Sequence, residues 1–471
     1  MTPEEYLQQD ATALAALVRS SDVTPRELLD LAIMRLEAVN PSLNAVVQKL
    51  YDFARKEIEA GLPEGPFRGV PFLLKDQTDL AGVATRRGST ILGEFISEKD
   101  SQLVARLRAA GVVIFGKTNM PELGLNVSTE PRETGPTPNP WNPAFSCGGS
   151  SGGSAAAITA GVCPAASAAD GGGSIRIPAS CCGLFGMKPS RGRVGKGWGG
   201  LTAHGVLSRS VRDSASLLDA ISNSESARSK AHPSPAIPFA EATRLRPAKL
   251  RVALVLEPHG GGAVHTDCLA AVRQAATLCG NLGHEIIETK LPEELAGYRE
   301  AASMMIRVNV FEQLEGIAAA RGAKLRPDDV ERATWTIYEA GKRASEDEYR
   351  RAVEEVRRAE HVMVQFGERF DLTLSPVLAE PPVALGVLDT MAEDVMAMFG
   401  RLREYSPFCN LFNATGQPAM SIPMIWNDAS LPIGAQFAGH FGDEATLFQL
   451  AAQIEEAAPW DHKHRDLWKT L

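Results

Sequence analysis

Two clusters of glycine and serine carry the residues best suited to chemistry in this sequence. The first spans residues 147–154 (CGGSSGGS) and the second spans residues 170–178 (DGGGSIRIP). Glycine lacks a Cβ, so the backbone can approach a ligand closely, and successive glycines can direct several N–H groups at one point. Such a nest suits a phosphate, or the oxyanion of an acyl-transfer reaction.

Three kinds of site compete for these clusters. A phosphate-binding loop would need GxxxxGK[ST] or GxGxxG, and neither cluster contains either pattern. Residues 148–152 satisfy the GxSxG pattern of an α/β-hydrolase elbow, but residues 139–146 contain two prolines where an elbow needs a central strand. The third kind of site is a serine nucleophile activated by a lysine.

Lys75 is the lysine with a suitable setting for that chemistry. It follows the apolar run 70–74 (VPFLL), which predicts a buried strand. Burial disfavours the charged ammonium, lowers the pKa of a lysine and leaves it able to accept a proton. Spacing alone leaves the alternatives open, because a lysine at a strand end commonly keeps its amine in water, and a serine among glycines is commonly a turn residue.

Composition limits the classes of protein to which the chain can belong. Its 471 residues carry a net charge of −9 with 44% hydrophobic residues, which excludes disorder and a collagen-like chain. The acidity disfavours a nucleic-acid or membrane-surface partner, and no apolar run is long enough to span a membrane. Seven scattered cysteines predict free thiols, and the histidines form no metal-binding pattern. With no leader-like start, we expect a cytoplasmic protein.

The elements that must position these residues follow an α/β pattern. A strand at 69–76, a helix at 101–110 and a strand at 112–115 indicate a parallel or mixed sheet. Further along the chain, residues 223–249 are the best candidate for a linker or surface excursion, since they are polar and rich in proline. We expect further elements in the C-terminal half, namely a strand at 250–256, a helical insertion at about 296–368, strands at 371–375 and 419–424, and a helix at 444–457.

The sequence resembles the amidase signature family. The resemblance rests on three blocks in the family's order, residues 69–76 (GVPFLLKD), 148–154 (GGSSGGS) and 173–179 (GSIRIPA). Ser150 and Ser174 lie 24 residues apart, as the family's two serines do. Four further matches extend the resemblance over nearly the whole chain, at residues 116–122 (GKTNMPE), 139–142 (NPWN), 186–192 (GMKPSRG) and 416–419 (GQPA).

The resemblance implies one α/β domain over residues 1–471, with a mixed, twisted central sheet sandwiched by helices. It implies that Ser174 is the acyl nucleophile, that Ser150 follows a cis peptide bond and relays a proton, and that Lys75 is the base. The remaining implied roles are an oxyanion hole from the N–H groups of Gly171, Gly172, Gly173 and Ser174, and loop support from Ser151, Asp170 and Arg176. No metal or organic cofactor is implied.

The resemblance also suggests a substrate class. Details of the C-terminal half are similar to the branch that hydrolyses nylon oligomers, so we expect small non-peptide amides, linear, cyclic or aryl, together with esters and carbamates. Leu125 and Asn126 match the region of the acyl pocket. A subunit of a glutamyl-tRNA amidotransferase is the alternative, although Ile177 replaces the glutamine usual there. Gly171 replaces a usual threonine or isoleucine. The expected partner is a small-molecule amide. The sequence leaves open whether the chain forms a homodimer.

Overall fold

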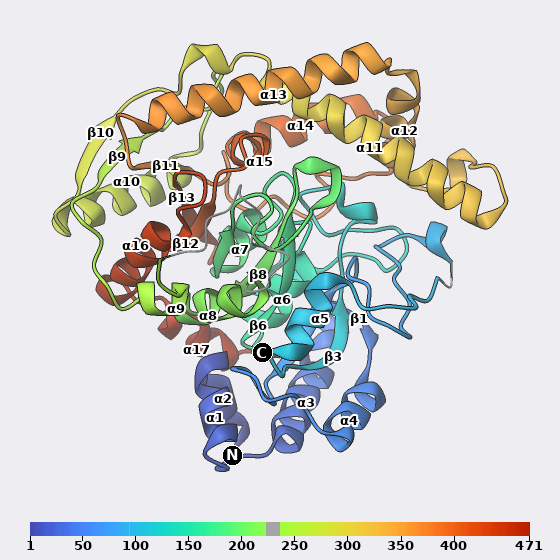
Figure 1. The fold of residues 1–471 in the computed structure, drawn as a ribbon, viewed down its shortest axis with the longest axis vertical. Helices are drawn as coiled ribbons and strands as arrows, with labels where there is room; N and C mark the ends of the chain where they lie inside the picture. Colours follow the sequence, from blue (N-terminus) through green and yellow to red (C-terminus); the bar gives the residue numbers. More distant parts are fainter. Residues whose placement is uncertain (94, 223–235) are drawn as a thin grey trace.

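The central element of the fold is a large mixed β-sheet (Figure 1). The computed structural model describes residues 1–93, 95–222 and 236–471. Within these ranges, eleven strands join in the order β1-β3-β2-β6-β8-β7-β12-β13-β11-β9-β10, and β4 and β5 form a separate pair. The strands are β1 (Val46–Lys49), β2 (Pro71–Lys75), β3 (Val113–Thr118), β4 (Pro138–Asn139), β5 (Asn142–Ser146), β6 (Ala165–Asp170), β7 (Phe185–Lys188), β8 (Ala203–Ser208), β9 (Arg251–Leu254), β10 (Glu285–Glu288), β11 (Leu372–Pro376), β12 (Ala419–Trp426) and β13 (Pro432–Ala438).

The sheet combines parallel and antiparallel pairs, and β1 at its edge is antiparallel to β3. β2 is parallel to both β3 and β6, and β9 is parallel to both β10 and β11, whereas β6, β8, β7, β12, β13 and β11 pair antiparallel in turn. The parallel pairing of β2 with β6 places the end of β2 beside the β6 strand that leads into the second glycine cluster. Two motifs that lie far apart in the sequence therefore meet at one edge of adjacent strands.

Helices flank the sheet, which confirms the predicted single α/β domain. The main hydrophobic core lies between the strands and the apolar faces of α3, α6, α8, α10 and α16. The helices are α1 (Pro3–Gln8), α2 (Ala11–Arg19), α3 (Pro25–Leu43), α4 (Tyr51–Ala60), α5 (Gln102–Ala109), α6 (Gly152–Thr159), α7 (Arg176–Cys182), α8 (Val211–Ser222), α9 (Phe239–Ala242), α10 (Thr266–Asn281), α11 (Tyr298–Arg321), α12 (Arg332–Arg343), α13 (Glu346–Gly367), α14 (Val395–Tyr405), α15 (Asn410–Ala414), α16 (Glu444–Ala457) and α17 (Asp461–Trp468).

The predicted helical insertion at about 296–368 consists of three helices. α11 packs against both α12 and α13, and the three lie together at the top of the molecule in Figure 1. α13 begins at a capping box in which Ser345 and Glu348 exchange side-chain and backbone hydrogen bonds. A separate apolar cluster that includes Tyr298, Ala302 and Val356 holds this layer together. The insertion therefore forms a helical layer, called the helical roof below, that packs on the rest of the fold through this cluster.

The segment predicted as a linker or surface excursion, residues 223–249, is described only from residue 236 onward. Residues 223–235 lie outside the described residues. The rest contains α9, whose Phe239 is fully buried and packs against Phe448 of α16. The backbone N–H groups of Phe239 and Ala240 donate hydrogen bonds to the Asp219 carboxylate. This part of the segment is thus packed on the domain, because an aromatic side chain within a polar sequence supplied an anchor.

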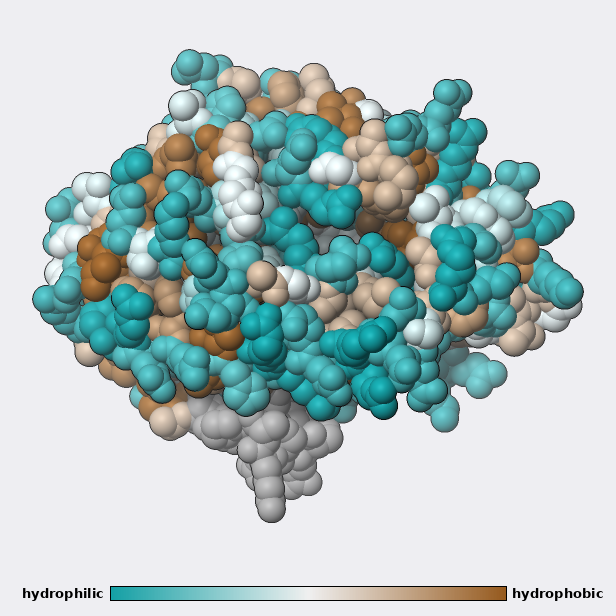
Figure 2. Space-filling model, turned by 90° about the horizontal axis from the view of Figure 1, so that it is seen from above, coloured by the Kyte–Doolittle hydropathy of each residue, from teal (hydrophilic) through white to brown (hydrophobic). Residues whose placement is uncertain are grey.

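The face of the molecule seen in Figure 2 is mostly hydrophilic. Figure 2 shows hydrophobic residues as separate patches among hydrophilic ones on the face seen from above. Within the described ranges, no helix combines the length and the apolar character that a membrane crossing needs. All seven cysteines are buried and free, as the odd and scattered count predicts. The polar surface and the buried thiols suit a chain whose chemistry lies in an internal cavity.

Candidate active site

Lys75 and Ser150 form a buried hydrogen-bonded pair. Lys75 Nζ lies 2.6 Å from Ser150 Oγ, and both side chains are buried. Lys75 is the last residue of β2, and its backbone N–H donates to Ser167 Oγ on β6, which fixes the end of the strand. Ser150 follows a cis peptide bond from Gly149. The structure thus places the two residues in contact, with a cis bond between Gly149 and Ser150, while their roles as base and proton relay stay a prediction.

Burial prepares Lys75 to be uncharged. It lowers the pKa of the Lys75 amine from its usual value to about 7, although the nearby negative charge of Asp170 acts in the opposite direction. The amine can then exist as a neutral base near pH 7. A neutral amine accepts the hydroxyl proton of Ser150, whereas the ammonium form donates to the same oxygen. The pair can therefore move a proton in either direction.

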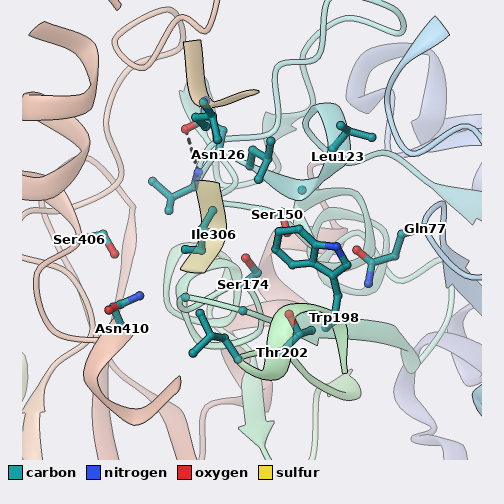
Figure 3. A pocket seen from close by; sticks show the side chains of 18 of the residues that line it. Gln77, Leu123, Asn126, Ser150, Ser174, Trp198, Thr202, Ile306, Ser406 and Asn410 are labelled. Atoms are coloured by element: carbon teal, nitrogen blue, oxygen red, sulfur yellow. Dashed lines mark hydrogen bonds between the residues drawn. The ribbon is translucent and has the colours of Figure 1, made fainter. Parts of the chain in front are cut away.

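Ser174 opens onto the same cavity as Lys75 and Ser150. It lies on the turn between β6 and α7 and is 8% exposed. Figure 3 shows Ser150 and Ser174 close to the middle of the cavity, with Trp198 and Gln77 on one side and Ser406 and Asn410 on the other. The cavity has a volume of about 390 Å³, enough for a small molecule.

Asp170 and Arg176 hold the loop that carries Ser174. Two nitrogens of Arg176 each donate to the Asp170 carboxylate at 2.9 Å, and both side chains are fully buried. Burial alone would raise the pKa of Asp170, but Arg176, with Lys188 and Asn413, outweighs it and holds the pKa below its usual value. The carboxylate therefore stays charged. Loop support by both residues stays a prediction, and these contacts are the geometry that it requires.

The nest of N–H groups differs from the predicted set at Gly173. Its N–H donates to Asp170 Oδ1 at 2.7 Å rather than pointing into the cavity, and Gly173 does not line the cavity. Its φ of 130° belongs to glycine, and a methyl group there would lie 2.6 Å from Ile177 Cδ1. Gly171, Gly172 and Ser174 do line the cavity, and within the described chain their N–H groups have no acceptor. The Asp170 carboxylate thus takes one of the four predicted donors.

The remaining predicted residues lie around this centre. Ser151 is buried, and its hydroxyl lies 3.4 Å from both the N–H and the carbonyl oxygen of Ala169, linking the two glycine clusters. Leu125 and Asn126 both line the cavity, as predicted. The Asn126 amide donates to the Leu388 carbonyl at 2.8 Å. This hydrogen bond fixes the side chain within the cavity wall, so that its amide group is already engaged.

Sequence reasoning missed a second set of cavity residues. They come from the segment between β7 and β8, from β8 itself, from the helical roof, from the end of α14 and from the residues up to the start of α15, and no local motif marks them. Only for Gln77 did the sequence offer an indication of a place in the cavity, since it lies two residues after Lys75. The cavity residues that no motif marked include Trp198, Thr202, His204, Arg299, Ser303, Ile306, Arg403, Ser406 and Asn410.

Known proteins resemble this chain over almost all of its length. The family model described as "Amidase" matches residues 27–448. The 6-aminohexanoate-cyclic-dimer hydrolase of Paenarthrobacter ureafaciens is 37% identical over 96% of both chains. A solved structure of a 6-aminohexanoate cyclic dimer hydrolase superposes with a TM-score of 0.90 at 35% identity, covering 98% of this chain and 99% of that one. The structure of a bacterial aryl acylamidase of the amidase signature family gives 0.87 at 26% identity, covering 98% of both.

These matches and the fold together define the class. The chain belongs to the amidase family, the family that its sequence blocks predicted. It is an amidase, a hydrolase of carbon–nitrogen bonds other than peptide bonds.

Proposed function

We propose that this amidase hydrolyses small non-peptide amides through an acyl-enzyme on Ser174, with Ser150 as proton relay and Lys75 as base. The observation that carries the proposal is the 2.6 Å contact between Lys75 Nζ and Ser150 Oγ beside the cavity that Ser174 lines. A lysine with a lowered pKa is a suitable base for a hydroxyl, and a serine between them connects base and nucleophile.

The first half-reaction transfers the acyl group to the enzyme. Ser174 Oγ bonds to the amide carbonyl carbon while its proton passes to Ser150, whose own proton passes to the neutral amine of Lys75. The carbonyl π electrons move to oxygen and form an oxyanion. As the intermediate collapses, the carbon–nitrogen bond breaks and the leaving nitrogen takes a proton back through Ser150. The free amine leaves, and Lys75 is neutral again.

The second half-reaction frees the enzyme. Water gives a proton to the same relay and attacks the ester carbonyl, and the bond to Ser174 Oγ breaks as that oxygen recovers a proton. The N–H groups of Gly171, Gly172 and Ser174 are the proposed oxyanion donors, each worth roughly 3–4 kcal/mol in comparable acyl-transfer enzymes. Asp170 fixes this nest through Gly173, which makes Gly173 a positioning residue rather than a donor.

The proposed substrates are small amides, linear, cyclic or aryl, with esters and carbamates that share the carbonyl chemistry. One relative is called a 6-aminohexanoate-cyclic-dimer hydrolase and one solved relative an aryl acylamidase. The cavity walls support a partly apolar acyl group, because Leu123, Leu125, Val127, Leu201 and Ile306 all line it. We keep a small-molecule amide as the proposed partner.

Active-site labelling tests the proposed roles. The purified chain is treated with a serine-reactive fluorophosphonate and the adduct is mapped by peptide mass spectrometry, followed by turnover of an acyl para-nitroanilide. We expect the label on Ser174 and its loss in Lys75→Ala, with turnover reduced by ~10⁴-fold or more in Ser174→Ala.

Other outcomes assign different chemistry. A label on Ser150 would overturn the assigned roles of the two serines. If the chain shows no label and no turnover, the stand-alone hydrolase would be overturned. That result would favour a subunit that needs partner chains. Ser180→Ala is the matched control, since Ser180 is also a buried serine on the adjoining helix α7 but hydrogen-bonds to Gly434 N outside the cavity.

A further inference from the structure

The charge of the cavity wall is one-sided. Three arginines line it, Arg87, Arg299 and Arg403, and none of the described residues that line it is an aspartate or glutamate. Within the described chain none of the three arginines forms an ion pair. Guanidinium groups stay charged in proteins. The cavity lining therefore carries positive charge that no negative group among the described lining residues matches.

Two of these arginines belong to one end of the cavity. Arg299, on the first turn of α11, donates from a terminal nitrogen to the Pro407 carbonyl at 2.9 Å. Pro407 follows Ser406 directly, and Arg403 lies on the last turn of α14 just before it. Figure 3 places Ser406 on one side of the cavity, across Ser174 from Trp198 and Gln77. The segment around Ser406 thus brings Arg299 and Arg403 to the same side.

Asn410 adds neutral hydrogen-bonding groups at this end. Its Oδ1 is buried without a hydrogen-bond partner in the described structure. Its Nδ2 lies next to the proposed oxyanion loop, 3.7 Å from where a methyl group on Gly172 would be. Ser406 and Ser303 contribute hydroxyl groups to the same cavity. Oδ1 is an acceptor, so it suits an N–H donor of a ligand, whereas the Nδ2 group and the two hydroxyls can donate to an anion.

We propose that this end of the cavity binds a carboxylate on the substrate, so that the enzyme prefers amides bearing an anionic group away from the scissile bond. The proposal rests on the proposed hydrolase function and names its substrate class. Arginine pairs with carboxylates through two parallel hydrogen bonds, which gives both attraction and orientation. Arg299, held by the Pro407 carbonyl, and Arg403 supply the charge, and Asn410 and Ser406 supply neutral donors.

The position of this end relative to Ser174 explains why a charge there would orient the substrate. A carboxylate bound by Arg299 and Arg403 places the rest of a short substrate across Ser174, toward the side of Trp198 and Gln77. The carboxylate can belong to the acyl part or to the amine part of the amide. A carboxylate on either part would bind the same arginines, and two separate substrate series distinguish the two cases.

Matched substrates measure the preference directly. For the acyl part we would compare the mono-para-nitroanilide of succinic acid with the para-nitroanilides of butanoic and γ-aminobutanoic acids, which are anionic, neutral and cationic. For the amine part we would compare para-acetamidobenzoate with acetanilide. We expect kcat/KM about tenfold higher for the anion than for the neutral compound in one of the two series, and lowest for the cation.

Variants connect that preference to the two arginines. The Arg403 side chain is exposed, so Arg403→Gln leaves the core intact. Arg299→Gln removes the guanidinium that donates to the Pro407 carbonyl. Each is expected to cut the ratio of anionic to neutral kcat/KM severalfold, chiefly by raising KM for the anion. Arg351→Gln on α13 is the control, because it changes the net charge equally but lies on an exposed helix face outside the cavity.

Binding to Ser174→Ala gives a second measurement that needs no turnover. Calorimetric titration with succinic mono-anilide and with butanoic anilide is expected to show tighter binding of the anion, lost in Ser174→Ala/Arg403→Gln. Equal binding and equal kcat/KM for anionic and neutral compounds in both series would overturn the carboxylate site. A preference that survives both arginine variants would overturn it as well. Ser174-dependent hydrolysis of the neutral anilide would still support the hydrolase, so the two failures are separable.

Discussion

The Thr202 hydroxyl occupies the space beside Gly171 that a side chain there would need. A methyl group on Gly171 would lie 2.9 Å from Thr202 Oγ1, closer than such contacts normally come. Both residues line the cavity, and Gly171 is one of the proposed oxyanion donors. The departure from the threonine or isoleucine usual in the family is thus matched by a neighbour that fills the vacant volume.

This contact predicts coupling between the two positions. Gly171→Ala should lower kcat about tenfold, since the methyl group displaces either the Thr202 hydroxyl or the loop that carries the oxyanion donors. Thr202→Ala removes the obstructing oxygen, so the double variant should be more active than Gly171→Ala. Steady-state kinetics of the four proteins form a double-mutant cycle. Independent effects of the two substitutions would contradict the contact as the cause.

The buried amine of Lys75 predicts the pH dependence of the reaction. Burial lowers its pKa to about 7, and the neutral amine is the proposed base. Activity should therefore fall as the pH decreases through about 7 and level off above it. Lys188 is a second buried lysine whose pKa burial lowers to about 7, but it donates to the Pro189 carbonyl instead of a serine.

The two lysines can be separated by substitution. Lys188→Met should keep the pH profile of kcat, whereas Lys75→Met should abolish activity at every pH, as a stopped assay of anilide hydrolysis from pH 5 to 9 would measure. Loss of the acidic limb in Lys188→Met with retention in Lys75→Met would reverse the assignment.

Asp170 is expected to be essential for stability. Asp170→Asn leaves the Arg176 guanidinium buried without a counter-charge and should lower the free energy of unfolding by about 3–5 kcal/mol. Asp30→Asn is the comparison, because the Arg26–Asp30 pair is half exposed and should cost less than about 1 kcal/mol. Urea unfolding followed by circular dichroism measures both. Similar losses in the two variants would show that the buried pair does not hold the loop.

His464 should make the fold sensitive to acid. Burial lowers its pKa from 6.5 to about 3, so the folded chain keeps it neutral while the unfolded chain protonates it below pH 6.5. The free energy of unfolding should therefore drop by about 2–3 kcal/mol between pH 6.5 and 4.5 from this group alone.

A substitution isolates that contribution. His464→Phe, placed between the rings of Trp141 and Trp468, should flatten the decrease, whereas His361→Phe on the exposed surface of α13 should not. Denaturant unfolding at both pH values is the measurement. An unchanged pH dependence in His464→Phe would exclude His464 as its source.

The sequence alone determined the family and the elements closest to its motifs. The apolar run before Lys75 specified a buried strand, and the glycine clusters identified the loops around Ser150 and Ser174, because these signals are local in the chain. α3 shows the limit of local signals. A proline commonly ends a helix, but α3 continues past Pro41 to Leu43, whose buried side chain anchors the last turn. The missing N–H of Pro41 costs one hydrogen bond.

The tertiary structure alone decided what surrounds the serines. Arg299 and Arg403 are more than a hundred residues from Ser174 in sequence, and only the packing of α11 and α14 over the cavity brings them to its wall. Likewise, the sequence predicted the Gly173 N–H as an oxyanion donor. In the structure it donates to the Asp170 carboxylate, because that side chain points toward its own loop. Local spacing encodes turns and strands, whereas the charge and shape of a cavity depend on contacts between distant segments.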